Sequence, residues 1–219
     1  PREEFQRTVA GTVEVLEFVR RSGRPVPLVY PSSAAVYGTA KILPIAEQAE
    51  KRPISPYGVF RQAAEALLAS YASTYRLPVG IIRFFSLYGP GLKKQLLWDA
   101  SEKLSSGDGL FFGTGEEKRD WLHVSDAARL FEFVAKKADH SCPVWNGAAG
   151  QGVTVKEVIS LLAEEIGAKT EVKFKGQARA GDPVHYVADV QRLHALGFRP
   201  ETDLATGIRE YARWYRENS

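Results

Sequence analysis

Hydrophobic residues along the chain alternate between helical and strand-like spacing, which predicts an α/β protein. From Phe5 to Val19, apolar residues recur every three or four positions, as on one face of a helix. Apolar runs at residues 25–30 and 79–85 are bounded by turn residues, as expected of strands buried on both faces. A helix is predicted between them, over residues 57–76. The order helix, strand, helix, strand is typical of one side of a doubly wound parallel sheet.

The second part of the chain has shorter predicted elements and more polar residues. We place a domain boundary near residue 90, where this change occurs. Beyond it the spacing of apolar residues predicts helices over residues 94–104, 125–137, 154–166 and 204–217 and strands over residues 121–124, 144–146 and 171–174.

Composition narrows the class of protein. The formal charge of +3, from 29 basic and 26 acidic residues, is too small to indicate nucleic-acid binding. No apolar run is long enough for a membrane span, and the single cysteine, Cys142, fits a reducing compartment. We therefore expect a cytosolic protein that binds neither nucleic acid nor membrane. Because the chain starts with Pro1 inside a predicted helix and contains no methionine, we expect upstream sequence to be missing.

Two segments carry candidate chemistry: residues 31–38 (PSSAAVYG) and residues 55–61 (SPYGVFR). Ser33 lies just past the end of a predicted strand, and ligands of open α/β sheets bind at the carboxyl ends of strands. Tyr57 and Arg61 are four residues apart on a predicted helix and therefore share one face, where the fixed positive charge favours phenolate. Either feature alone is commonly structural. Together, in this order, they predict a site at which a hydroxyl and a phenol transfer a proton.

These segments resemble the extended short-chain dehydrogenase/reductase family, specifically its nucleotide-sugar epimerases and dehydratases. The resemblance covers nearly the whole chain and includes motifs at residues 8–12, 32–38, 55–58, 83–90, 113–115, 119–126, 179–182 and 188–200.

The resemblance implies an NAD-binding Rossmann-type domain, without its N-terminal part, and a smaller substrate domain. Residues 1–90 would form the C-terminal half of the dinucleotide-binding domain. Residues 91–219 would mainly bind the nucleotide sugar, with a segment near 118–145 returning to the first domain. The resemblance also implies a homodimer that packs through the helices over residues 5–21 and 57–76.

The family mechanism assigns roles to matching positions. Tyr57 would exchange a proton with a sugar hydroxyl while hydride passes between the sugar carbon and the nicotinamide, and Ser33 would hydrogen-bond the same sugar oxygen. Arg61 occupies the position of the lysine that binds the nicotinamide ribose. The implied cofactor is NAD, with NADP left open, and the implied partner is a nucleotide-diphosphate sugar. Implied cofactor contacts are Thr8, Ser32, Tyr57, Arg61 and Phe84. Implied substrate contacts are Ser33, Ser86, Arg119, Asn146, Arg179 and Asp182.

Three positions depart from the family pattern. Arg61 replaces lysine, which keeps the charge but changes its shape and reach. Thr8 and Ser86 stand where asparagine is usual, so each keeps a hydroxyl and loses an amide. The family resemblance therefore does not define how these three side chains would contact the cofactor.

The chain contains no glycine-rich dinucleotide fingerprint at the expected place, so the sequence does not distinguish NAD from NADP. Residues 147–152 (GAAGQG) are glycine-rich, but their spacing is wrong and they lie late in the chain. Thr154 and Glu157 make a capping box just after them. We interpret this segment as an ordinary loop before a helix.

The residues after Ser33 favour one reaction over another. Dehydratases of the family usually have an acidic pair there, which supplies the acid and base for loss of water. Here the positions are Ala34 and Ala35. We therefore favour an NAD-dependent sugar 4-epimerase that oxidises and re-reduces the same carbon. The alternatives are a dehydratase or reductase of the same family and a non-catalytic nucleotide-sugar-binding protein.

His123 and Asp126 are close in the sequence, but two residues are too few to hold zinc. We expect both to have packing roles and predict no metal site.

Overall fold

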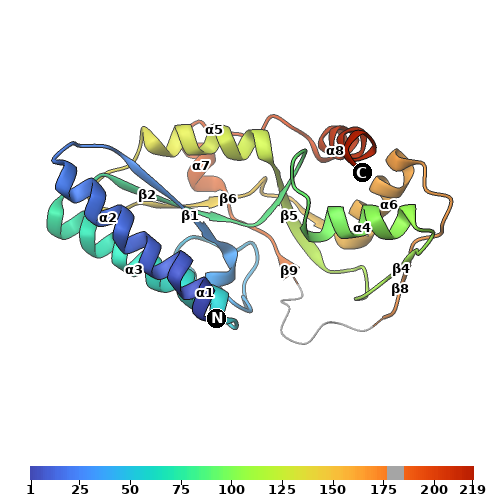
Figure 1. Cartoon of the computed structure of the whole chain (residues 1–219), viewed down its shortest axis with the longest axis horizontal. Coiled ribbons are helices and arrows are strands. Elements are labelled where there is room, and N and C mark those ends of the chain that lie inside the picture. Colours follow the sequence, from blue (N-terminus) through green and yellow to red (C-terminus); the bar gives the residue numbers. More distant parts are fainter. Residues whose placement is uncertain (177–184) are drawn as a thin grey trace.

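The computed structural model describes residues 1–176 and 185–219 and shows an elongated α/β protein with two parts (Figure 1). One part contains a three-stranded parallel sheet between helices. The other contains short strands surrounded by the helices near the C-terminus. Arg179 and Asp182, two predicted substrate contacts, lie outside the described residues.

The first sheet has the strand order β1-β2-β6, and all of its pairs are parallel. It consists of β1 (Leu28–Ser33), β2 (Val79–Phe84) and β6 (Val144–Gly147). Ser33, Phe84 and Gly147 are paired at the carboxyl ends of the three strands. The predicted α/β class with a parallel sheet is therefore confirmed.

Helices cover both faces of this sheet. α2 (Gly11–Ser22) and α3 (Pro56–Tyr75) lie side by side on one face, and α5 (Val124–Ala135) covers the other (Figure 1). α3 begins where its sequence predicts, because the Ser55 hydroxyl accepts the Gly58 N–H at 3.2 Å and Pro56 occupies the first turn.

The alternation of side chains along β2 explains why this strand is apolar throughout. Val79 and Ile81 pack against α2 and α3, whereas Ile82 and Phe84 pack against α5. All six residues of β2 are buried. Each fully buried aliphatic side chain here stabilises the fold by roughly 2 kcal/mol. Arg83 is the one charged residue of the strand and lies on the α3 face.

The second part is organised around β5 (Lys118–His123), which pairs with three other short strands. β3 (Ser86–Tyr88) and β9 (His185–Tyr186) are parallel to it, and β7 (Gly152–Thr154) is antiparallel. A separate parallel ladder joins β4 (Leu110–Phe111) and β8 (Lys173–Phe174). The remaining elements are α1 (Arg2–Phe5), the π-helix η1 (Gln6–Ala10), η2 (Ala34–Val36), α4 (Gln95–Ser105), α6 (Val155–Ile166), α7 (Gln191–Ala195) and α8 (Leu204–Asn218).

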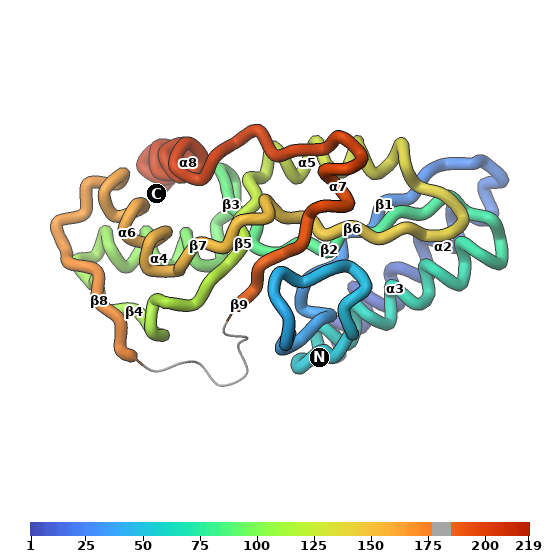
Figure 2. Tube along the Cα trace, turned by 180° about the vertical axis from the view of Figure 1, so that it is seen from behind, coloured from blue at the N-terminus to red at the C-terminus, as the bar shows by residue number. Residues whose placement is uncertain are grey.

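Packing and backbone hydrogen bonds between segments distant in the sequence join the two parts of the protein. β6 is a strand of the first sheet and α5 packs on that sheet, although β5, which precedes both in the sequence, belongs to the second sheet. The segment between η2 and α3 also runs beside the chain that follows β9, as seen from behind in Figure 2. There the Ile45 N–H donates to the Val187 carbonyl at 2.7 Å, and the Asp189 N–H donates to the Ile45 carbonyl at 2.9 Å. Within the described residues, no helix combines the length and the apolar character that a membrane crossing requires.

Candidate active site

Ser33 stands at the point where β1 ends and the short helix η2 begins. Its backbone is extended, and its Oγ accepts the Ala35 N–H at 3.2 Å. The serine thus caps η2 at the carboxyl edge of the parallel sheet, where the sequence predicted a ligand-binding hydroxyl.

The start of α3 packs directly on this turn. Gly58 lies so close to η2 that a Cβ at this position would be 2.5 Å from the Ala35 carbonyl oxygen. Tyr57, the preceding residue, is 40% exposed and is therefore accessible from solvent. The close approach at Gly58 brings the phenol-bearing turn of α3 next to the turn that follows Ser33.

Arg61 lies between two tyrosine rings. Its guanidinium carbon is 5.0 Å from the centroid of the Tyr57 ring and 5.8 Å from that of the Tyr30 ring. Its Nη1 donates to the Pro31 carbonyl at 2.9 Å and to the Tyr30 hydroxyl at 3.3 Å. The Arg61 Nε is buried and has no hydrogen-bond partner among the described residues. Arg61 thus keeps one donor uncommitted beside Tyr57, and its positive charge adjoins the phenol as predicted.

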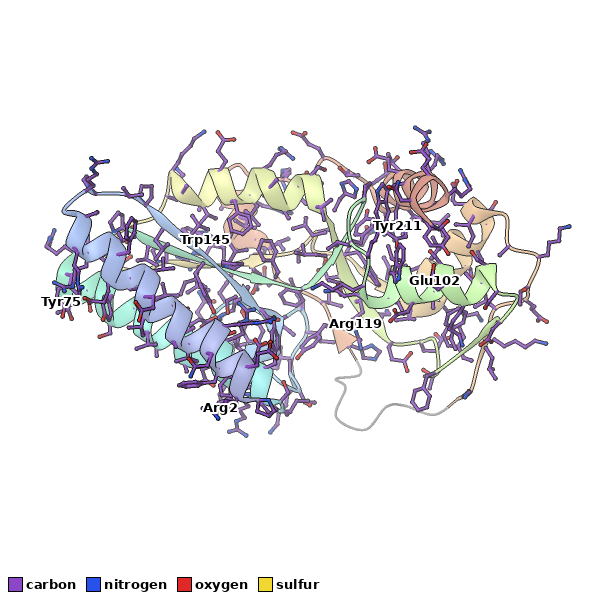
Figure 3. All side chains as sticks on the ribbon, viewed as in Figure 1. Arg2, Tyr75, Glu102, Arg119, Trp145 and Tyr211 are labelled. Carbon is purple, nitrogen blue, oxygen red and sulfur yellow. The ribbon has the colours of Figure 1, made fainter. Side chains whose placement is uncertain are left out.

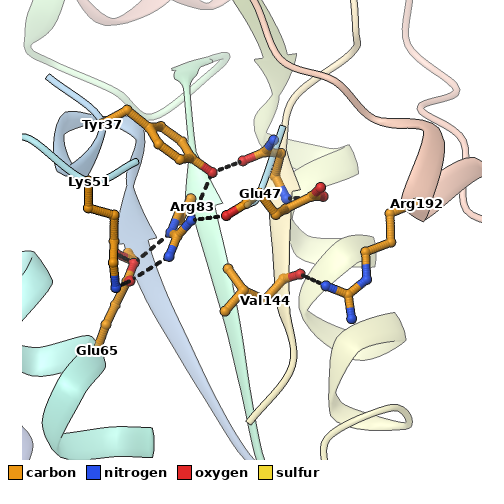
Figure 4. A network of polar contacts seen from close by, with 9 residues as sticks. Tyr37, Glu47, Lys51, Glu65, Arg83, Val144 and Arg192 are labelled. Atoms are coloured by element: carbon orange, nitrogen blue, oxygen red, sulfur yellow. Dashed lines mark hydrogen bonds and ion pairs between the residues drawn. The ribbon is translucent and has the colours of Figure 1, made fainter. Parts of the chain in front are cut away.

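A buried ion pair lies beneath this site (Figure 4). Arg83 of β2 donates from Nε to Glu65 Oε1 at 2.9 Å and from Nη2 to Oε2 at 2.7 Å. The Ser32 hydroxyl donates to the same Glu65 Oε1 at 2.6 Å. Burial acts to raise the pKa of Glu65, but the hydrogen bonds and charge of Arg83 outweigh it and hold the pKa below its ordinary value.

The network continues across the sheet through Tyr37. Its hydroxyl accepts from Arg83 Nη1 at 2.9 Å and donates to Asn146 Oδ1 at 2.7 Å. Burial raises the pKa of Tyr37 to about 12, so this phenol stays protonated at neutral pH. The Asn146 amide nitrogen donates to the carbonyls of Ile45 and Asp189 at 2.8 and 3.1 Å. Asn146 thus ties β6 to the segment between η2 and α3 and to the chain that follows β9.

A cavity of about 520 Å³ lies in the second part. The cavity is lined by Ser86, the first residue of β3, and by Arg119 of β5. Figure 3 shows Arg119 between the two parts of the protein. The cavity combines aromatic and charged groups, a mixture suited to a base and a phosphate. Its lining includes Ser86, Tyr88, Lys94, Asp99, Phe111, Phe112, Glu117, Arg119 and Trp121.

The loop at the cavity wall is held in shape by one carboxylate. Glu117 accepts the N–H groups of Thr114 and Gly115 at 2.9 and 2.8 Å. Gly113 and Gly115 have φ values of 96° and 84°, which favour glycine. The positive φ values therefore explain why glycine occupies both positions of the motif at residues 113–115.

Several predicted contacts occupy other surroundings than expected. The Thr8 hydroxyl donates to Glu4 at 2.7 Å inside the N-terminal helix, and Phe84 packs on Phe131 with ring centroids 5.5 Å apart. Ser32 is committed to Glu65, as described above. Asn146 is fully buried and is absent from the cavity lining, because its amide holds two backbone carbonyls. We therefore leave Asn146 out of the proposed substrate contacts.

Sequence reasoning gave Glu65 and Arg83 no role, yet they lie at the centre of the site's support. The signal was present: Arg83 interrupts an apolar strand, and Glu65 is four residues after Arg61 on the same helix face. A charge in a strand that is buried on both faces requires a partner of opposite charge. Glu65 is that partner.

Comparisons with known proteins identify the family of this chain. The model of the NAD dependent epimerase/dehydratase family matches residues 1–146. The chain belongs to this family. Members of it are enzymes, and the Rossmann-type fold predicted from the sequence is the fold of the matching structures.

Relatives in the family include both epimerases and dehydratases. The dTDP-glucose 4,6-dehydratase of Streptomyces griseus is 30% identical over 218 residues, which covers 98% of this chain and 66% of the relative. Against three further curated relatives, the chain spans 57% to 71% of their lengths.

Solved structures of the family superpose well. A UDP-glucose 4-epimerase from Thermotoga maritima, solved with UDP-glucose, has a TM-score of 0.90 and 27% identity over 99% of this chain and 72% of its own. MoeE5, solved with UDP-glucuronic acid and NAD, has a TM-score of 0.87 and 34% identity over 98% of this chain and 73% of its own.

Proposed function

We propose that this family member is an NAD-dependent nucleotide-sugar 4-epimerase. The observation that carries the proposal is the packing of Tyr57, Arg61 and the Ser33 turn at one edge of the parallel sheet. That edge is where open α/β sheets bind their ligands. The relatives and structures that bind UDP-glucose or NAD support the choice of substrate class and cofactor.

The proposed chemistry divides between the cofactor and the side chains. NAD, when bound, would supply reversible hydride transfer at the sugar C4 carbon. Tyr57 removes the proton of the C4 hydroxyl as hydride leaves, and donates it back when hydride returns. Ser33 donates a hydrogen bond to the same oxygen. The Arg61 guanidinium, 5.0 Å from the centroid of the Tyr57 ring, orients this ring beside the reacting oxygen.

The side chains near Tyr57 fit a nicotinamide ribose. The unpartnered, buried Arg61 Nε is a donor that a ribose hydroxyl can satisfy, and a buried donor without a partner is costly. Tyr57 is accessible beside it. Thr8 and Ser32 direct their hydroxyls to Glu4 and Glu65, so we assign the ribose contact to Arg61 and Tyr57.

The cavity supplies the groups that a nucleotide diphosphate needs. Arg119 and Lys94 are cations at its wall and suit the diphosphate, whereas Phe111 and Phe112 offer apolar surface to the base. Ser86 lies at the start of β3, directly after β2, and is placed to contact the sugar-phosphate end. We retain Arg179 and Asp182 as proposed substrate contacts from the family resemblance.

A 4-epimerase is favoured over a dehydratase because Ala34 and Ala35 form η2 next to Ser33. Neither side chain can donate or accept a proton, so elimination of water would lack an acid and a base at this turn. The dehydratase relatives keep that reaction as the second candidate.

The experiment incubates the full-length protein with UDP-glucose, UDP-N-acetylglucosamine and UDP-glucuronic acid and analyses the sugars by NMR. We expect the 4-epimer of one of them without net consumption of cofactor. Tyr57→Phe should reduce this rate by a factor of 100 or more, since a positioned acid–base group contributes about 10²–10⁴-fold. A 4-keto-6-deoxy sugar would identify a dehydratase, and absence of any reaction would favour a binding protein.

We also propose that the protein is a cytosolic homodimer. Cys142, the single cysteine, is free and buried, which fits a reducing compartment. The helices α2 and α3 expose large apolar side chains, and Phe18 is 75% exposed. A second copy packed on this face would cover them. The apolar residues of this face, with the adjoining α1, are Phe5, Val15, Phe18, Val59 and Tyr75.

A further inference from the structure

Three polar residues form a row across the first sheet near its carboxyl edge. Ser32 pairs with Arg83, and Arg83 pairs with Asn146, on strands that are otherwise mostly apolar. Residues at the same level of a parallel sheet direct their side chains to the same face. On this face Ser32 and Arg83 both reach Glu65 of α3. The row therefore connects the sheet to the helix that carries Tyr57.

We propose that Ser32, Glu65 and Arg83 are positioning residues that fix Tyr57 against Ser33, an inference that rests on the proposed function. None of the three touches the substrate in this assignment. They act by fixing the position of α3 along its axis, and its rotation about that axis, relative to the end of β1.

α3 is attached to β1 and η2 at several points along its axis, among them the hydrogen bond from Arg61 to the Pro31 carbonyl. Gly58 packs against the Ala35 carbonyl at the first turn, and the Glu65 carboxylate binds the Ser32 hydroxyl about two turns later. Two contacts separated along the axis restrict both sliding and rotation of a helix. Tyr57 adjoins Gly58 in the sequence and Ser33 adjoins Ser32, so each reacting residue is the chain neighbour of an anchored one.

The ion pair between Arg83 and Glu65 fixes the orientation of the Glu65 carboxylate. Arg83 binds Glu65 with two parallel donors, and its Nη1 also donates to the Tyr37 hydroxyl and the Glu47 carbonyl. Only 3% of Arg83 and 3% of Glu65 is exposed. A bidentate pair fixes the orientation of both planar groups, which apolar packing of the same volume would not do. The Glu65 carboxylate is thereby presented to Ser32 in one geometry.

The principal test is Ser32→Ala, which removes one hydroxyl and leaves the Arg83–Glu65 pair intact. We expect kcat for 4-epimerisation to fall by roughly 10-fold to 100-fold, since small misplacements of reacting groups have effects of this order. KM for the nucleotide sugar should stay the same, because the cavity lies in the other part of the protein. Ser32→Thr, which restores a hydroxyl, should recover most of kcat.

The matched control is Ser125→Ala. The Ser125 hydroxyl also bonds a side chain, His123 Nδ1, at 2.7 Å, but it lies at the start of α5, away from α3. This control should leave kcat unchanged. Arg83→Lys provides a second variant that keeps the charge and loses the bidentate geometry, and it should lower kcat as Ser32→Ala does.

A structural readout separates this inference from the proposed function. The Gly58 and Val59 amides bond to Ser55 in the first turn of α3, at 3.2 and 3.0 Å. Hydrogen exchange at these amides should be faster in Ser32→Ala and unchanged in Ser125→Ala. If Ser32→Ala changes neither kcat nor this exchange, the inference is overturned. If exchange increases but the wild-type protein epimerises no sugar, the positioning contact stands and the proposed function fails.

Discussion

Arg119 and Asp120 are adjacent residues of β5 whose side chains serve opposite faces of the strand. Arg119 lines the cavity, whereas Asp120 is fully buried and accepts backbone N–H groups from Ala149, Gly150 and Ala188 at 2.8 to 3.1 Å. Arg119 thus presents a cation to the proposed diphosphate, while Asp120 holds the loop at residues 149–150 and the backbone at Ala188.

We expect Asp120→Asn to destabilise the protein strongly. An amide can accept through one oxygen only, and its NH₂ group would face backbone donors, so buried N–H groups lose their partner. The free energy of unfolding should fall by about 2 kcal/mol or more, as measured by urea denaturation. Asp189→Asn is the control, because the Asp189 carboxylate accepts the N–H of Gln191 in a local turn and holds no distant segment among the described residues. An equal loss in both variants would contradict the role given to Asp120.

The helices and the first sheet were predictable from the sequence because their signals are local. The predicted helix over residues 57–76 is α3, Pro56–Tyr75, since Ser55 and Pro56 mark its start. The apolar run at residues 79–85 is β2. The strands β3, β4, β7 and β9 have only two or three residues each, too short for a periodic pattern. They are defined by partners distant in the sequence, such as Lys118 and His185, which no local pattern reveals.

Gly58→Ala should disrupt the candidate site. The added Cβ would lie 2.5 Å from the Ala35 carbonyl oxygen, so α3 and η2 must separate. We expect lower thermal stability and a loss of epimerase activity of at least 10-fold, because Tyr57 moves with the first turn. The measurements are the melting temperature and the rate of 4-epimer formation.

Gly11→Ala is the matched control for that substitution. Gly11 is also helical, but its Cβ would meet nothing nearer than the Gln6 carbonyl oxygen at 3.6 Å, an ordinary contact. Alanine should stabilise this helix by about 0.5–1 kcal/mol relative to glycine. Equal effects of the two substitutions would show that the approach of Gly58 to Ala35 is not what limits this position.

The candidate site was partly predictable for a different reason. Tyr57 and Arg61 share a helix face through their spacing alone, and the structure places the guanidinium over the phenol ring. The surroundings of Asn146 could not be predicted, because they depend on Ile45 and Asp189, which are far away in the sequence. A polar residue at a strand end can face a ligand or hold another segment, and only the fold distinguishes these roles. The same limitation hid the pairing of Glu65 with Arg83.

Cys142 should be unreactive in the folded protein. Burial, with smaller contributions from the charges of Glu65 and Asp139, raises the pKa of its thiol to about 12. The thiolate is the reactive form, so Ellman's reagent at pH 8 should modify Cys142 only as fast as the protein opens. Reaction should become fast in urea. Rapid modification of the native protein would contradict the buried position.

The same thiol predicts a pH dependence of stability. Its pKa is higher in the folded protein than the ordinary value near 9, so above pH 9 the unfolded chain loses this proton first. The contribution of Cys142 to the free energy of unfolding therefore decreases as pH rises from about 9 towards 12. Cys142→Ala should remove this part of the alkaline loss, measured as the difference between the two unfolding curves across that range.

The exposed apolar face of α2 and α3 leads to a prediction about assembly. If a second copy covers this face, Phe18→Glu places a charge in the interface and should convert the dimer to a monomer in sedimentation velocity. Ile42→Glu is the control, because Ile42 is 79% exposed but lies outside both helices, and it should leave the dimer intact. A wild-type protein that sediments as a monomer would refute the proposed dimer. Dissociation by Ile42→Glu alone would place the interface at the segment between η2 and α3.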